Sequence, residues 1–238
     1  MSKIKLFCIP FAGGSAVVFN QWRPLLSRDI ELKPVELAGR GRRIRESLYG
    51  SLEQAVDDLF KIIAPELDQG PYALLGHSMG SLIAFELYYK IKASNLPEPL
   101  HAFFSGRGAP SMPTAEKKKY HLLPEDEFKK EMIELGGTSR EFFEHPELVE
   151  VFLPLMRQDL KIHEYYRFQE KPGPLSCPVT VLNGKEDPET TIEEAEAWRQ
   201  HSSGHFTIYH FEGGHFFLTE QFQTVVKIIN QSLIPVSA

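Results

Sequence analysis

The segment LLGHSMGS (74–81) constrains this chain more than any other, because it places a serine between two glycines where two elements meet. The apolar residues before it predict a buried strand, and residues 81–93 after it predict a helix. Gly76 and Gly80 lack the Cβ atoms that would clash in so sharp a turn. A G-x-S-x-G turn between a strand and a helix presents the serine hydroxyl above the sheet, at a helix N-terminus. We therefore predict that Ser78 is a nucleophile, and the alternative is a serine that only forms a turn.

The rest of the chain alternates strands and helices in the order that builds a parallel sheet with helices on both faces. The apolar patterns predict strands at residues 4–10, 30–37, 72–78, 100–106, 177–184 and 206–214, and helices at residues 51–67, 81–93, 193–202 and 219–233. A length of 238 residues suits one such domain, so we predict a single domain over residues 1–238.

One region, residues 110–174, departs from this alternation. It has no convincing strand, and residues 124–137 and 147–168 read as helices. A helical insertion between two core strands is a candidate lid over a site, and the alternative is one more packing layer. Its apolar side chains include five that we expect to line a substrate chamber: Phe142, Phe143, Phe152, Leu153 and Met156.

A serine nucleophile needs a base, and the base needs a carboxylate that orients it. Among nine histidines, His215 stands out because it follows FEGG, after the last predicted strand and before the last helix. The two glycines allow the loop to place the imidazole over the edge of the sheet. Asp187, just before Pro188 in the loop after strand 177–184, is the predicted carboxylate, and Glu186 is the alternative.

The negative charge that develops on an attacked carbonyl oxygen also needs N–H donors. The Met79 N–H, at the start of the helix after Ser78, is one predicted donor. The second is expected from the loop PFAGGS (10–15), where Ala12 is preferred and Phe11 is the alternative. This loop lacks the Lys-Ser/Thr pair of a phosphate loop, so we do not expect it to bind a nucleotide.

Charge and composition exclude several classes of protein. The net charge of −6 argues against nucleic acid as the main partner. Cys8 and Cys177 lie in apolar stretches, which is typical of buried thiols in a reduced, cytoplasmic protein, and no cysteine or histidine spacing predicts a metal site. No apolar run is long enough to cross a membrane, and the interrupted N-terminal run reads as a strand and not as a signal peptide.

Five segments, in this order, resemble the type II thioesterases, which are stand-alone α/β-hydrolases associated with non-ribosomal peptide and polyketide synthetases. They are FCIPFAGGSA, ELAGRGRR, LLGHSMGSLIAFEL, FFSGRGAP and YHFEGGHFFL, and the resemblance runs from Lys5 to about residue 230. It implies an α/β-hydrolase fold with a helical lid, and it places the nucleophile, acid and base on Ser78, Asp187 and His215.

The resemblance also implies a function: hydrolysis of acyl or aminoacyl thioesters on the phosphopantetheine arms of carrier domains, which clears misprimed or stalled synthetase modules. The partners would be acyl- or peptidyl-carrier domains. No cofactor is expected, because the substrate carries the phosphopantetheine, and we expect a monomer. The alternatives are a carboxylesterase or an acyltransferase of the same fold, or a non-catalytic homologue that only binds a carrier.

Two basic runs fit either a functional or a structural role. The arginines of GRGRRIRE (39–46) could contact a phosphopantetheine phosphate or a carrier surface, but such runs more often pair with nearby carboxylates in solvent. Residues 117–119 are three lysines near the start of the expected lid, and they could contact a carrier or simply be solvated.

Overall fold

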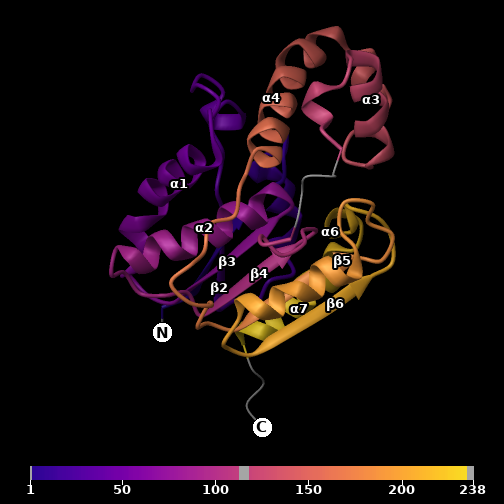
Figure 1. Ribbon diagram of the computed structural model, residues 1–238. Coiled ribbons are helices and arrows are strands. Elements are labelled where there is room, and N and C mark those ends of the chain that lie inside the picture. Colours follow the sequence, from indigo (N-terminus) through magenta and orange to yellow (C-terminus); the bar gives the residue numbers. More distant parts are fainter. Residues whose placement is uncertain (1, 113–117, 235–238) are drawn as a thin grey trace.

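A computed structural model describes residues 2–112 and 118–234 of the chain. Six strands form one parallel sheet in the order β2-β1-β3-β4-β5-β6 (Figure 1). The strands are β1 (Ile4–Ile9), β2 (Ile30–Pro34), β3 (Tyr72–His77), β4 (His101–Ser105), β5 (Val179–Gly184) and β6 (Phe206–Phe211). All six predicted strands are confirmed. Because the strands are parallel, their carboxyl ends share one edge of the sheet, and the loops that follow them meet there.

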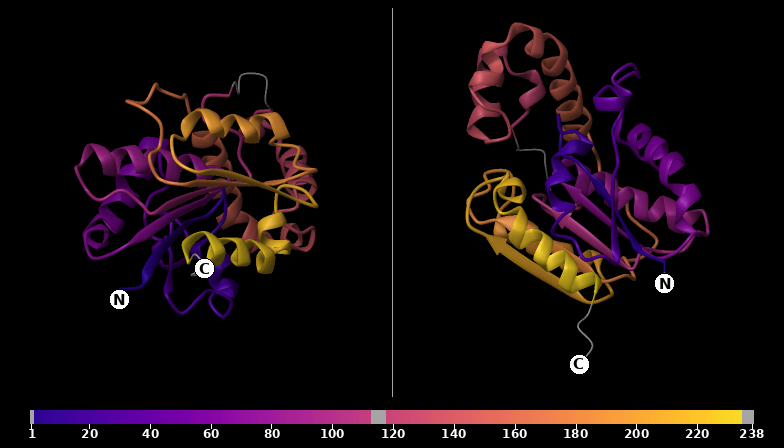
Figure 2. Two further views of the ribbon diagram at one scale, coloured as in Figure 1. Left: turned by 90° about the horizontal axis from the view of Figure 1, so that it is seen from below. Right: turned by 180° about the vertical axis from the view of Figure 1, so that it is seen from behind.

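Helices cover both faces of the sheet, as Figure 2 shows. One face packs against α1 (Leu52–Leu67), α2 (Met79–Ala93) and the short helices α5 (Ile192–Glu196) and η5 (Ala197–His201). The other face packs against η1 (Ala16–Trp22), α6 (Phe217–Glu220) and α7 (Phe222–Leu233). This layering of helix, sheet and helix explains why the strands read as continuous apolar runs.

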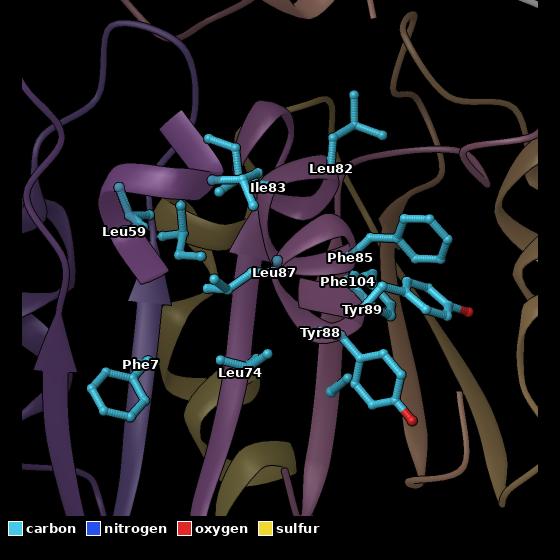
Figure 3. Close-up of a cluster of buried hydrophobic side chains, with 14 of the residues drawn as sticks. Phe7, Leu59, Leu74, Leu82, Ile83, Phe85, Leu87, Tyr88, Tyr89 and Phe104 are labelled. Atoms are coloured by element: carbon cyan, nitrogen blue, oxygen red, sulfur yellow. The ribbon is translucent and has the colours of Figure 1, made fainter. Parts of the chain in front are cut away.

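Alternation of side chains along β1 divides the core between the two faces. Phe7 and Ile9 join the cluster under α1 and α2, whereas Leu6 and Cys8 join the cluster under α7. Figure 3 shows the first cluster, in which aliphatic and aromatic side chains of α2 lie over the strands. The two clusters bury both faces of the sheet, and its carboxyl edge carries the candidate site.

The helical insertion that the sequence predicts over residues 110–174 contains η3 (Tyr120–Leu122), α3 (Glu125–Glu134), η4 (Glu141–Glu144) and α4 (Pro146–Glu164). Its helices α3 and α4 stand apart from the sheet (Figure 1). The insertion has a small core of its own that includes Phe128 and Leu155. The described part of this region holds helices and no strand, as the sequence predicts, whereas residues 113–117 lie outside the described residues. A role as a lid remains a prediction.

Some element ends differ from the sequence predictions. β2 ends at Pro34, although the next N–H, that of Val35, still donates to the Cys8 carbonyl oxygen at 2.9 Å. The predicted helix over 219–233 is divided into α6 and α7 at Gln221. The predicted helix over 193–202 is a short α-helix followed by a 3₁₀ turn. None of the helices in residues 2–112 and 118–234 combines the length and apolar character that a membrane crossing requires.

Candidate active site

Ser78 lies in a strained turn between β3 and α2. Its backbone has φ 55° and ψ −117°, a conformation that non-glycine residues rarely adopt, and its N–H donates to the Ser105 carbonyl oxygen at 2.7 Å. A Cβ on Gly76 would lie 2.0 Å from the Gly80 carbonyl oxygen, and one on Gly80 would lie 2.3 Å from the Ile9 carbonyl oxygen. Glycine is therefore required on both sides of Ser78, because the neighbouring atoms are backbone and cannot move away.

His215 and Asp187 form a buried pair at the same edge of the sheet. The His215 Nδ1–H donates to Asp187 Oδ2 at 2.8 Å, and the Asp187 side chain is fully shielded from solvent. Asp187 Oδ1 accepts the Glu189 N–H at 2.8 Å, which fixes the plane of the carboxylate. This arrangement leaves the other ring nitrogen, Nε2, free to act as a base. Glu186, the alternative carboxylate, is exposed and forms no ion pair or side-chain hydrogen bond with His215.

Ser78 and His215 both line a cavity of about 330 Å³ between the sheet and the helical insertion. No direct hydrogen bond joins the Ser78 hydroxyl to His215 in this structure. Such bonds are often long before substrate binds and tighten in the complex, so the arrangement is compatible with a nucleophile and its base.

The predicted oxyanion donors lie beside this cavity. Ala12 and Phe11 line it, and Met79 begins α2 directly after Ser78. Within the described residues, neither the Ala12 nor the Met79 N–H donates to any acceptor, so both are available to a substrate oxygen. Whether they form the oxyanion hole stays a prediction.

Three of the five predicted chamber residues reach the cavity: Phe142, Phe152 and Met156. The structure places Phe143 and Leu153 elsewhere, in a shallow groove on the other side of the insertion. The reason is helical geometry. Phe152 and Met156 are four residues apart and share one face of α4, whereas Leu153 is turned away by about 100°.

Several cavity residues were missed by the sequence analysis, including Met132, Leu135, Leu160 and Phe216. Helical spacing could have indicated Leu160, because it follows Met156 by four residues. Nothing in the local sequence indicates Met132 or Leu135, because α3 is separated from Ser78 along the chain and meets it only through the fold.

A second, smaller cavity of about 50 Å³ also reaches Ser78 and His215. Its other walls are mostly polar or charged, and they include Arg107, Lys119 and Tyr120. Arg107 is 6% exposed, and no acceptor for its Nε lies in the described part of the chain. The nucleophile and the base thus lie where a large cavity lined mainly by apolar residues meets a small one lined by several charged residues.

His77, next to Ser78, has a structural role. It is fully buried, it hydrogen-bonds the Ser105 hydroxyl through Nδ1 at 2.9 Å, and its ring packs 5.2 Å from that of His215. Burial lowers the pKa of His77 well below the ordinary value for histidine. A neutral ring behind the base adds no charge to the site.

The basic runs pair mainly with protein groups. In residues 39–46, Arg40 forms a buried ion pair with Asp159 of α4, and Arg43 pairs with Asp58. Lys119 donates to a backbone carbonyl oxygen on α4 and Lys118 pairs with a glutamate of α3, whereas Lys117 lies outside the described residues. The simpler reading of this run places its arginines in solvent. Arg40 is instead buried against Asp159, which lies far along the chain.

The parallel sheet, the strained serine turn and the histidine–aspartate pair at its carboxyl edge define an α/β-hydrolase. The chain belongs to the thioesterase family, because the family model of the thioesterase domain matches residues 4–233. It is similar to gramicidin S biosynthesis protein GrsT of Aneurinibacillus migulanus, with 37% identity over 232 residues that cover 98% of this chain and 90% of GrsT. It is also similar to the medium-chain S-acyl fatty acid synthase thioesterase of Homo sapiens, with 35% identity over 223 residues that cover 91% of this chain and 81% of the human protein.

Solved structures agree with this assignment. ClbQ from the colibactin NRPS/PKS pathway superposes with a TM-score of 0.92 at 36% identity, over 98% of this chain and 97% of ClbQ. The type II thioesterase BorB from the borrelidin biosynthetic cluster gives 0.87 at 34% identity, over 97% of this chain and 93% of BorB. The resemblance to type II thioesterases is confirmed, and the chain is a hydrolase of that kind.

Proposed function

We propose that this thioesterase hydrolyses acyl and aminoacyl thioesters on the phosphopantetheine arms of carrier domains, and so clears misprimed or stalled synthetase modules. The observation that carries the proposal is the position of Ser78 and His215 at the junction of two cavities. A carrier-bound thioester also has two unlike halves, an apolar acyl group and a polar pantetheine arm. The large cavity, lined mainly by apolar residues, suits the first half, and the small one, lined by several charged residues, suits the start of the second.

The proposed reaction begins with attack of the Ser78 hydroxyl oxygen on the thioester carbon. His215 Nε2 takes the hydroxyl proton, and Asp187, hydrogen-bonded at Nδ1, stabilises the imidazolium that forms. The carbonyl oxygen becomes an oxyanion that the Met79 and Ala12 N–H groups stabilise. The intermediate then expels the thiol, which receives the proton from His215, and the acyl group remains on Ser78 as an ester.

Water completes the proposed cycle. His215 removes a proton from a water molecule that attacks the acyl-serine, and the same N–H groups stabilise the second oxyanion. Collapse of this intermediate returns the proton to the Ser78 oxygen and releases the carboxylic acid. Every step uses groups of this chain and water, so we propose that no cofactor takes part.

The relatives support the carrier-bound substrate. The names of GrsT, ClbQ and BorB connect those proteins with gramicidin S, colibactin and borrelidin biosynthesis, and the human relative is named for fatty acid synthase. Multidomain synthetases of these kinds present the growing acyl group on a carrier. We accordingly propose acyl- or peptidyl-carrier domains as partners, with the enzyme acting as a cytoplasmic monomer.

The test is hydrolysis of a panel of acyl-loaded carriers by the purified protein, with products identified by mass spectrometry. The expected products are a free acid and a carrier with a free thiol, and Ser78→Ala is the control. Transfer of the acyl group to an added alcohol or amine would indicate an acyltransferase, and preference for an oxygen ester would indicate a carboxylesterase. Failure of a fluorophosphonate probe to label Ser78 would favour a non-catalytic homologue.

A further inference from the structure

Asp159 of α4 reaches out of the helical insertion to the loop that carries the predicted oxyanion donor. Its Oδ2 accepts the Gly13 N–H at 2.8 Å. The Arg40 guanidinium binds the same carboxylate through two nitrogens, with Nη1 2.6 Å from Oδ2 and Nη2 2.9 Å from Oδ1. Arg40 Nη1 also donates to the Gly14 carbonyl oxygen at 3.0 Å. The pair therefore holds one N–H and one C=O in consecutive residues of the loop.

These contacts fix the peptide plane that carries the Ala12 N–H. Gly14 donates its N–H to the Phe11 carbonyl oxygen at 2.9 Å, and a trans peptide places the Ala12 N–H opposite that carbonyl. The direction of the Ala12 N–H is therefore set by the Phe11–Gly14 turn. Arg40 and Asp159 hold this turn from outside, because they bind Gly14 and Gly13.

The same helix lines the large cavity. Met156, one turn before Asp159, packs so closely on the loop that a Cβ on Gly13 would lie 2.8 Å from its Cγ. Phe152, Met156 and Leu160 form a cavity wall on one face of α4. The helix α4 thus lines the cavity proposed for the acyl group and also contacts the loop proposed to stabilise the oxyanion.

Both charges of the pair are nearly inaccessible, since Arg40 and Asp159 are each 1% exposed. Burying such a pair gives little net stability, because desolvation offsets the attraction between the charges. Its bidentate geometry, however, specifies one relative position of two segments that lie 119 residues apart in the chain. A role in positioning explains the pair better than a role in stability alone.

We propose that Asp159 and Arg40 are positioning residues that fix the Ala12 N–H for oxyanion stabilisation. Through these two residues, the position of α4 against the loop affects catalysis. The inference rests on the proposed mechanism at Ser78. It assigns to α4 two linked tasks, contact with the acyl group and alignment of the donor loop.

The test uses the double variant Arg40→Met with Asp159→Asn, which removes both charges and leaves neither one unpaired. We expect kcat to fall about 10- to 100-fold with KM within about twofold, because loss of one oxyanion donor costs on the order of 10² to 10³. An alkyl boronic acid, which forms a tetrahedral adduct on the serine, should lose affinity by a similar factor. A non-hydrolysable thioether analogue of the substrate should bind as before, since it makes no oxyanion.

A matched control separates positioning from general loosening. Lys171 and Glu86 form an ion pair that ties the segment after α4 to α2 without touching the donor loop, with Lys171 Nζ 2.6 Å from Glu86 Oε2. Lys171→Met with Glu86→Gln should lower the melting temperature and leave kcat and boronate affinity unchanged. Equal losses in the two double variants would overturn the proposal, as would wild-type kcat and boronate affinity in the Arg40/Asp159 variant.

Arg40→Lys is a milder second variant, in case the double variant does not fold. Lysine keeps the positive charge beside Asp159 but lacks the planar fork that reaches the carboxylate and the Gly14 carbonyl together. A smaller fall in kcat, matched by the same fall in boronate affinity, is expected, and an unchanged kcat would contradict the proposal. Failure of the proposed mechanism looks different, because Ser78→Ala would then retain activity.

Discussion

At the scale of single residues, Ser78 contributes its hydroxyl to the proposed chemistry and its backbone to the turn. Ser78→Ala keeps the Cβ and the N–H that binds the Ser105 carbonyl, so the fold should be retained. Turnover should fall by about 10⁴- to 10⁶-fold, as it does when a triad member is removed. Steady-state hydrolysis and a melting curve check both parts, and residual activity above about a tenth of wild type would exclude Ser78 as the nucleophile.

Asp187 and Glu186 are adjacent, and the structure gives them different environments. Asp187→Asn should keep its place beside the Glu189 N–H but favour the wrong tautomer of His215, and kcat should fall by about 10⁴-fold. Glu186→Gln is the matched control, because this side chain is exposed and should affect kcat by less than about twofold. Measurement of kcat for both variants tests this assignment. A large loss of kcat in Glu186→Gln and a small one in Asp187→Asn would exchange the roles of the two carboxylates.

At the scale of elements, the packing of β4 against β5 makes stability depend on pH. His101, the first residue of β4, hydrogen-bonds the Thr180 hydroxyl at 2.8 Å, and burial, with a smaller contribution from His205, lowers its pKa to about 4. Between pH 4 and 6.5 the unfolded chain therefore binds the proton more readily than the folded one. The free energy of unfolding should decrease as pH falls through this range.

His101→Gln removes this titration and should make the pH dependence shallower. Between pH 7 and pH 5 the wild type should lose about 2 kcal/mol more than the variant, for a reference pKa of about 6.5. Denaturant unfolding at the two pH values gives the comparison. Activity should be unchanged, because His101 begins the strand and Ser78 lies beyond the opposite edge of the sheet. Identical slopes would show that His101 titrates alike in both states.

The two faces of the helical insertion predict different effects on acyl selectivity. Phe152 lines the cavity with Ser78, so Phe152→Ala should enlarge it and raise kcat/KM for long acyl groups relative to short ones by about tenfold. Phe143→Ala removes a ring of the same size from the other side, where it can lower stability but should leave chain-length preference unchanged. A series of acyl thioesters tests both variants, and a shift with Phe143→Ala alone would contradict this cavity assignment.

At the scale of the whole molecule, the proposed partner is much larger than the cavity. The net charge of −6 disfavours long-range attraction to an acidic carrier, so docking should depend on local contacts around the entrance. Energy from such contacts can position the thioester over Ser78. We therefore expect kcat/KM for one acyl group to be at least about tenfold higher on a carrier than on coenzyme A or a short thiol, which requires about 1.4 kcal/mol. Equal values for the three substrates would remove the carrier from the mechanism.

Most of the fold could be predicted from the sequence because its signals are local. The apolar runs of the six strands, the glycines around Ser78 and the loop of His215 each depend on a few neighbouring residues. Element ends were predicted less accurately: β2 ends at Pro34, before the predicted end, although the Val35 N–H still donates to the Cys8 carbonyl oxygen at 2.9 Å. The choice between Asp187 and Glu186 needed tertiary contacts, since both follow β5 and only Asp187 meets His215.

The sequence by itself determined the strand–turn–helix at Ser78, the parallel sheet and the family, because backbone sterics and apolar periodicity act over short distances. Only the tertiary structure decided which face of α4 lines the cavity and which arginine of residues 39–46 is buried. Arg40 finds Asp159 at a separation of 119 residues, and no local pattern specifies that partner. Long-range pairs of this kind depend on how the helical insertion packs against the sheet, and this packing involves the chain as a whole.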